Sequence, residues 1–466
     1  MRKITIFFMA IFIYALNLIT IFGQEKGDLN ISLEQFIKAA CEKDMVFKEI
    51  LIDQLKLKYQ KLLKLPAGDI VLAIESQHDF LFDPDESDTK GTISLSKLFP
   101  YTGTEVTTEY TSSLSTSTRA VTSEFTAYIS QPIAENAFGK NTRLLDKITG
   151  LEVDAAQYQI IEAYEDYLAS LIQLYYNWYS AYENLKAGQV SYAENTKLLE
   201  NIKERQKNKI ALAIDVNKIN LQVVAKKENL VSLEQEYAEY LNLIKQAISY
   251  KEKEDILPQD SLFYAEAVID FAQDYKKFFS QSRTSLMLKL LEEKSSLEVS
   301  KYADELLPSI DFIAGYTVEG LGRDLHKPEK IIYAGLSLDW PFSGRVENAQ
   351  YEISKIDLKK TKLSSENIHT KLYTNLKNLN NQIEQEKKLI SIAKDKTKLS
   401  EAIVEDETKD YSLGRTTLNS LIDEINKLEN NKFSQISHQI QSKKLIVEWL
   451  RLTDILVKSS DIVKKQ

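Results

Sequence analysis

Apolar residues recur at intervals of three and four positions along several long stretches of this chain, with charged residues between them. The C-terminal stretch illustrates the spacing with Leu418, Leu421, Ile425 and Leu428. Neither glycine nor proline occurs within residues 189–257, 346–413 or 415–466. Because these two residues are the strongest breakers of helices, the stretches predict very long helices with one apolar stripe each. At about 1.5 Å per residue, a helix from Arg345 to Asp410 would be roughly 100 Å long, deeper than any single globular core.

A period of two replaces this spacing in shorter regions. From Ser309 to Glu319 every second residue is apolar, Ile310 and Phe312 among them. Each alternating run has about 10 residues, the length of a tilted strand that crosses a membrane. A soluble sandwich with one wet face shows the same alternation, so the pattern alone leaves both structures open.

The order of helices and strands occurs twice along the chain. One strand region extends from Pro66 to Pro132 and the other from Pro308 to Pro341, and a long helical stretch follows each of them. Such internal repetition indicates a duplicated architecture. The first strand region spans 66 residues and the second 33. The surplus is interpreted as an additional hairpin at about 91–113, and the sequence does not decide whether it joins the barrel or lies at its mouth.

The duplication predicts four segments. They are a targeting segment at 1–23, a first repeat at 24–250, a linker at 251–262 and a second repeat at 263–466. The first repeat has strands at about 69–132 and a helical turn near 209–215, and the second has strands at about 308–341 and a turn near 411–417.

The targeting segment has the pattern of an export signal. Arg2 and Lys3 precede an almost wholly apolar stretch from Ile4 to Phe22. Cleavage after Gly23 is the first interpretation, and retention of the segment as a membrane anchor is the alternative. No other stretch approaches the ~20 apolar residues of a transmembrane helix, so a mature chain that crosses a membrane would do so as a β-barrel. Export, together with too few strands for a separate domain, favours the barrel over the sandwich.

Composition and the absent motifs exclude several classes of protein. A formal net charge of −9 argues against a nucleic-acid partner, and one cysteine excludes a disulfide framework. The four histidines, His78, His326, His369 and His438, show no ligand spacing. Glu366 and His369 form one Glu-x-x-His motif, whereas a di-iron bundle requires two. We therefore expect no enzyme activity, no metal and no cofactor. The aromatic cluster from Tyr175 to Tyr182 is expected to pack between helices just inside the barrel.

Four segments carry a resemblance to a known family. In chain order they are Ile31 to Ala40, Leu306 to Phe312, Gly335 to Arg345 and Tyr411 to Leu418. The middle two include the residues at the passages between helix and strand: Pro308, Trp340, Pro341 and Gly344. In this order and on a twofold repeat, the segments resemble the TolC-like outer-membrane efflux proteins over essentially the whole mature length.

The resemblance implies a mixed, mainly α fold with a transmembrane β-barrel. Each repeat would supply two strands and two pairs of helices. Three chains would close one barrel in the outer membrane, and their long antiparallel coiled-coil helices would form an α-barrel in the periplasm. The implied function is a passive exit duct of a tripartite efflux or type I secretion system. Its partners would be a periplasmic adaptor and an inner-membrane pump of the RND or ABC type, with lipid around the barrel. A structural coiled-coil protein of the periplasm or cell surface is the alternative.

The resemblance also implies a gate at the helix turns. Asp215 matches an aspartate that bonds to the tyrosine of the other turn, here Tyr411, and Arg415 would support this contact. Gly414 supplies the second turn, while the first has no glycine near Lys209.

Two further sets of residues follow from the same resemblance. Asp423 matches an aspartate of the acidic constriction, and Ser420 replaces a second acidic residue there. Adaptor contacts are expected at Ile210, Leu212, Leu413 and Thr416. Cargo and pump cannot be identified from the sequence.

Overall fold

The computed structural model describes residues 29–80, 87–115, 120–250, 256–259, 271–323 and 325–457. The predicted targeting segment and most of the predicted linker lie outside these residues. The chain divides into two compact units. Unit 1 comprises the described residues of Met1–Ile52, Ile160–Arg283 and Thr370–Gln466, and unit 2 those of Asp53–Gln159 and Thr284–His369.

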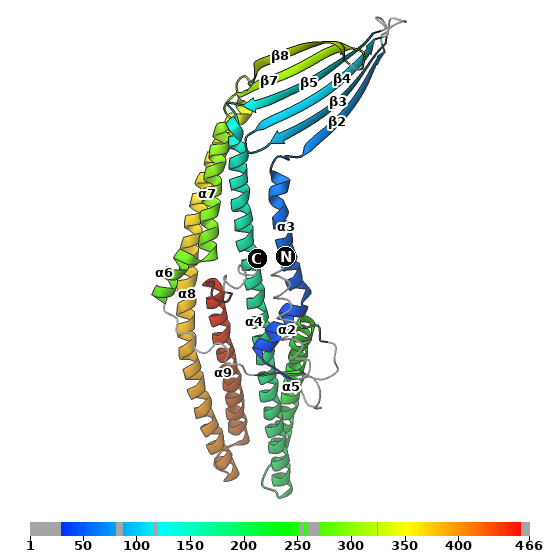
Figure 1. Ribbon diagram of the computed structural model, residues 1–466. Coiled ribbons are helices and arrows are strands. Elements are labelled where there is room, and N and C mark those ends of the chain that lie inside the picture. The colour runs from blue at the N-terminus through cyan, green and yellow to red at the C-terminus, as the bar shows by residue number, and fades with distance from the viewer. Residues whose placement is uncertain are drawn as a thin grey trace, which may run out of the picture. The chain divides into compact units, whose positions relative to one another are not determined.

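The order of elements repeats around the two strand regions (Figure 1). In the first half α2 (Leu33–Lys43) and α3 (Met45–Lys64) precede the strands, and α4 (Lys140–Lys207) and α5 (Ala213–Ala247) follow them. In the second half α6 (Phe271–Gln281) and α7 (Arg283–Asp304) precede the strands, and α8 (Arg345–Ser412) and α9 (Leu418–Leu452) follow them. Helices α4 and α8 each have 68 residues, and α5 and α9 each have 35. The matching lengths agree with a duplicated architecture.

Unit 2 contains one six-stranded antiparallel sheet in the order β2-β3-β4-β5-β7-β8 (Figure 1). Its strands are β2 (Ile70–Phe80), β3 (Ser87–Phe99), β4 (Thr104–Ser115), β5 (Ala120–Pro132), β7 (Ser309–Leu321) and β8 (His326–Asp339). The first repeat therefore supplies four strands, which corrects the implied contribution of two. The additional hairpin is β3–β4, and it joins the sheet because its residues keep the alternation that their neighbours have.

The sheet has one apolar and one polar face. Across one row of the register, Ile74, Ile93, Tyr110, Phe125 and Val318 are paired in succession, and the row ends at Lys330 of the edge strand β8. The adjacent row on the other face contains Thr92, Thr111 and Glu124. Threonine pairs hydrogen-bond across this polar face, Thr92 with Thr111 at 3.0 Å and Thr126 with Thr317 at 3.0 Å. The alternation of apolar and polar residues in the sequence thus gives a sheet with one apolar and one polar face.

The helices of unit 2 contact one another in the same order as the strands that they adjoin. Lys61 of α3 pairs with Asp146 of α4 at 2.9 Å. Glu152 of α4 pairs with Lys294 of α7 at 2.9 Å, and Ser295 of α7 hydrogen-bonds to Thr361 of α8 at 3.3 Å. Helices α3 and α8 are therefore the two ends of the helix series, as β2 and β8 are the two edges of the sheet.

Unit 1 has its main core around a short parallel pair, β1 (Leu29–Ile31) and β6 (Ile256–Pro258). Tyr175 and Trp178 are buried in this core, and the Tyr175 hydroxyl donates to the Ile31 carbonyl at 2.9 Å. The aromatic cluster thus belongs to the core of unit 1, which corrects its expected place beside the barrel. Strand β6 lies within the predicted linker, and its Ile256 is fully buried.

No described helix is both long enough and apolar enough to span a membrane.

Candidate functional site

The two helical turns of unit 1, residues 208–212 and 413–417, have the same backbone geometry. The Ile210 amide donates to the Arg205 carbonyl at 2.8 Å, and the Arg415 amide donates to the Asp410 carbonyl at 2.9 Å. Both turns need one residue in the left-handed region. Gly414 has a φ of 73° and Lys209 a φ of 60°. Lys209 thus takes the position that a glycine fills in the second turn, at the energetic cost that a Cβ brings there.

Each turn ends in a capped helix. Asp215 Oδ2 accepts from the Leu212 amide at 3.2 Å, which places a carboxylate at the positive end of α5. Thr417 Oγ1 accepts from the Ser420 amide at 3.2 Å at the start of α9. The Asp215 carboxylate therefore caps the N-terminus of its own helix, α5.

Arg205 joins the two turns. Its guanidinium lies 4.9 Å from the centre of the Tyr411 ring. Its Nη1 and Nη2 donate to the carbonyls of Ser412 and Tyr411 at 3.4 and 3.5 Å. These are long hydrogen bonds, so the cation–π contact supplies much of the attraction. Arg205 was not among the residues predicted from the sequence, although a cation near the end of one helix could have suggested a partner at the end of another.

The arrangement differs from the predicted contact of Asp215 with Tyr411. Among the described residues no hydrogen bond joins these two side chains, and Arg415 instead lies 3.7 Å from Asp410, with both side chains exposed. Burial raises the pKa of the Tyr411 hydroxyl, the charge of Arg205 opposes this shift, and the charge of Asp215 adds to it. Asp215 therefore acts on Tyr411 through its charge.

A second layer of contacts lies between α5 and α9. Gln222 Nε2 donates to Asn426 Oδ1 at 2.6 Å. Lys226 forms an ion pair with Glu429, and the two side chains are 13% and 9% exposed. An apolar cluster of the same region includes Leu199, Ile202, Ile219, Val223 and Leu418. The two hairpins are thus held together beside their turns by apolar packing and by largely buried polar pairs, none of which had been predicted.

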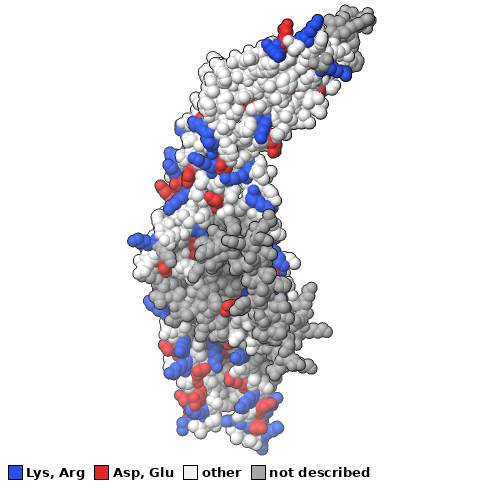
Figure 2. Space-filling model, in the orientation of Figure 1, with Lys and Arg blue, Asp and Glu red and all other residues white. Residues whose placement is uncertain are grey.

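The remaining predicted residues of the turns lie on the surface. Ile210, Leu212 and Leu413 are 66%, 68% and 63% exposed. Thr416 is half-buried, and Asp423 is exposed on α9. Figure 2 shows charged side chains crowded around the ends of the helical hairpins. Three apolar side chains are thus exposed at turns whose surroundings are charged.

The residues predicted at the passages between helix and strand form backbone turns. The Pro308 carbonyl accepts from the Glu135 amide at 3.1 Å, directly before β7. The Gly344 amide donates to the Pro341 carbonyl at 2.9 Å, and Gly344 has a φ of 46° just before α8. Trp340 is 57% exposed and packs on Phe342, with ring centres 6.3 Å apart. Pro308 therefore stands where a helix gives way to a strand, and Trp340, Pro341 and Gly344 stand where a strand gives way to a helix.

One carboxylate cluster of unit 1 has the spacing of a metal site. It consists of Glu162, Glu165 and Asp454. The guanidinium of Arg283 occupies its centre, with 3.2 Å from Nε to Glu162 and 3.2 Å from Nη2 to Asp454, and it also pairs with Glu165. The cluster is thus a buried network of ion pairs rather than a vacant cation site.

Comparison with known proteins finds similarity in structure. No protein-family model and no curated protein matches the sequence. The structure of CusC, described in connection with folding and transmembrane channel formation, matches with a TM-score of 0.72 at 10% identity, covering 93% of this chain and 95% of that one. The Campylobacter jejuni CmeC outer-membrane channel matches with a TM-score of 0.69 at 13% identity, covering 93% of this chain and 89% of that one. The open state of the Neisseria gonorrhoeae MtrE outer-membrane channel matches with a TM-score of 0.68 at 12% identity, covering 90% of this chain and 88% of that one. The chain therefore has the fold of the TolC-like outer-membrane channels.

Proposed function

We propose that the chain is the outer-membrane exit duct of a tripartite efflux or type I secretion system. It would act as a homotrimer, as a passive conduit that is gated at its helical turns. The observation that carries the proposal is a two-faced sheet whose free edges continue into helices with exposed apolar stripes. Such a wall is complete only when further copies close it.

The edges of the sheet are suited to pairing with another copy. Strand β2 follows α3 and strand β8 leads into α8, so the two edges have opposite directions. The β8 strand of one copy can therefore form an antiparallel ladder with β2 of the next. Apolar side chains are exposed on both edges, including Leu72 at 61% and Leu336 at 69%. An open edge of this length is a liability unless it is paired, and ring closure removes it.

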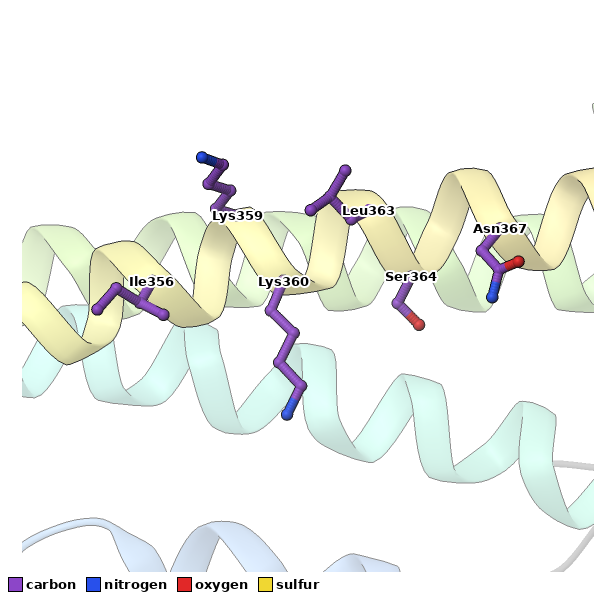
Figure 3. Close-up of a pocket in the computed structure, with 6 residues that line it drawn as sticks. All are labelled: Ile356, Lys359, Lys360, Leu363, Ser364 and Asn367. Carbon is purple, nitrogen blue, oxygen red and sulfur yellow. The ribbon is translucent and has the colours of Figure 1, made fainter.

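The helices at the two ends carry stripes that match these edges. On α8, the exposed residues Val346, Ile353, Ile356 and Leu363 follow heptad spacing. An open hollow on this helix is lined by residues from Ile356 to Asn367, and Figure 3 shows that all of them belong to α8. On α3, Leu55, Tyr59 and Leu62 form a stripe of the same kind. We assign the far wall of the hollow to α3 of a second copy, because α3 continues into the edge strand that β8 would pair with.

The resemblance supports three copies, with the sheet in the outer membrane and the helices in the periplasm. The exposed residues Ile210, Leu212 and Leu413 would bind a periplasmic adaptor, which connects the duct to an inner-membrane pump of the RND or ABC type. The Arg205–Tyr411 contact and the α5–α9 pairs would keep the turns closed, and Asp423 would contribute to an acidic constriction. No catalytic step is assigned to the chain.

Membrane fractionation tests this proposal against the coiled-coil alternative. We expect the chain in the outer membrane as a heat-modifiable trimer that forms small, cation-preferring pores in planar bilayers. A soluble, elongated dimer would instead support a structural coiled-coil protein.

A further inference from the structure

The hairpin β3–β4 matches the rest of the sheet in length. Strands β3 and β4 have 13 and 12 residues, and β5 and β7 have 13 each. Pairing is continuous from Asp88–Ser115 to Phe99–Thr104 within the hairpin, and from Glu105–Ser130 to Ser115–Ala120 along β5. A strand that crosses a membrane needs about 9–11 residues, so the hairpin is long enough to cross wherever β5 and β7 cross.

The hairpin also continues both faces of the sheet. Its apolar face carries Leu95 and Val106, which are paired in register with Leu72 of β2 and Ile129 of β5. Its polar face carries Glu105 and Glu109 on β4. A hairpin that lay in water over the mouth would gain nothing from the apolar residues on this face, because they would remain exposed.

The turn of the hairpin, residues 99–103, is fixed both to the end of β5 and to the start of α4. Arg143 Nη1 donates to the Tyr101 carbonyl at 2.8 Å, and Gln131 Nε2 donates to the Thr102 carbonyl at 2.9 Å. The approach is so close that a Cβ on Gly139 would lie 2.4 Å from the Tyr101 carbonyl oxygen. The hairpin is thus held at its base by the end of β5 and by the residues from Gly139 to Arg143 that follow the strands.

We infer that β3–β4 is a membrane-crossing part of the pore wall, and this inference rests on the proposed function. Three copies of a six-stranded sheet would close an eighteen-stranded barrel, rather than the twelve strands that two per repeat imply. Because barrel diameter grows roughly linearly with strand number, the pore at the membrane is about half as wide again. Glu105 and Glu109 of each copy would lie on its lumen and favour hydrated cations there.

Cysteine accessibility tests the inference in the assembled trimer. The chain has one cysteine, so Cys41→Ser provides the background. Single cysteines replace Glu109 and Thr111 on the polar face of β4, and Val106 and Thr108 on its apolar face. A membrane-impermeant cationic thiosulfonate is the probe. Because it reacts with a hydrated thiolate, we expect labelling at the polar positions at least about tenfold faster than at the apolar positions.

Matched positions on β5 separate this inference from the proposed function. Thr126→Cys on the polar face and Ala127→Cys on the apolar face should alternate in the same way. Alternation on β5 with uniform fast labelling on β4 would overturn the inference and leave the duct intact. Fast labelling at both β5 positions would overturn this inference and the proposed function together. Direct imaging of the trimer in lipid should count eighteen strands, and a count of twelve would reject the wider wall.

Discussion

At the scale of single residues, the two helix turns show how one backbone shape can be reached with different side chains. Gly414 enters the left-handed region without steric cost, whereas Lys209 enters it with a Cβ. The main hydrogen bonds that close the turns correspond, Lys209 to Gln206 with Gly414 to Tyr411 and Ile210 to Arg205 with Arg415 to Asp410. The first turn therefore retains a small strain that its surroundings must balance.

Substitution of Lys209 measures that strain. Lys209→Gly should stabilise the first turn by about 1 kcal/mol, because glycine adopts a positive φ freely. Gly414→Ala should destabilise the second turn by a similar amount. Hydrogen exchange of the amides in each turn measures both effects. Faster exchange around residues 208–212 in the glycine variant would contradict the expectation.

Substitution of Arg205 tests the proposal that its contact with Tyr411 keeps the turns closed. Arg205→Gln removes the cation–π contact with Tyr411, which is worth about 0.5–2 kcal/mol according to its burial, and should raise conductance in planar bilayers. Arg415→Gln is the matched control. Its ion pair with Asp410 is exposed and should contribute under about 1 kcal/mol. A larger increase in conductance for Arg415→Gln than for Arg205→Gln would contradict this expectation. It would favour the contact predicted from the sequence, in which Arg415 supports Asp215 and Tyr411.

At the scale of elements, the junction of the sheet with α4 depends on close backbone approach. Gly103 and Gly139 both have positive φ, and a Cβ on Gly103 would lie 2.8 Å from the Pro132 side chain. The two glycines allow the hairpin turn to lie against η2 (Ala137–Gly139), the short 3₁₀ helix that precedes α4. Their separation in the sequence gives no sign of this approach, because only the sheet register brings the two turns together.

Gly139→Ala should disrupt this junction. The new Cβ would meet the Tyr101 carbonyl and would also be strained by a φ of 76°, so we expect a loss of more than about 1 kcal/mol and a lower yield of trimer. Gly91→Ala lies in the same hairpin, where a Cβ meets nothing within 4 Å, and serves as the control. Semi-native electrophoresis before and after heating measures trimer yield. Equal yields for both variants would refute a structural role for the close approach.

At the scale of the whole molecule, one buried network links three distant parts of the chain. Arg283, which is 3% exposed, contacts Glu162, Glu165 and Asp454, so one positive charge faces three carboxylates. Burial raises the pKa of both Glu162 and Asp454, and the charge of Arg283 opposes both shifts. Burial therefore makes ionisation of Glu162 and Asp454 less favourable in the folded state.

The sign of the resulting pH dependence follows from these shifts. A carboxyl group whose folded pKa is raised binds protons more readily in the folded state, so its contribution to stability increases as the pH falls from that raised pKa toward the ordinary value of 4.5 for Glu162. As the pH falls through this window, we expect the free energy of unfolding of the wild type to increase relative to that of Glu162→Gln. Urea unfolding followed by the fluorescence of the buried Trp178 and Trp449 measures it. A difference that stays constant with pH would exclude Glu162 as the titrating group.

The sequence alone determined the elements and their repetition. Runs without glycine or proline defined α8 and α9 because helix formation is local, and alternation defined β7 and β8 because side chains of a strand point to opposite faces. A glycine between two such runs likewise predicts a turn, and Gly414 lies between the end of α8 and the start of α9. The sequence pattern could not predict the partners of charged side chains, because these depend on distances between elements that are far apart in the chain.

Only the tertiary structure decided how these elements combine. It placed β3–β4 inside the sheet, because inter-strand hydrogen bonding is non-local and a two-faced strand can pair wherever the register permits. It also paired β1 with β6 and brought Arg205 to Tyr411 across 206 positions of sequence. Local periodicity thus specified the parts of this protein, and long-range packing specified the width of its wall and the contacts at its turns.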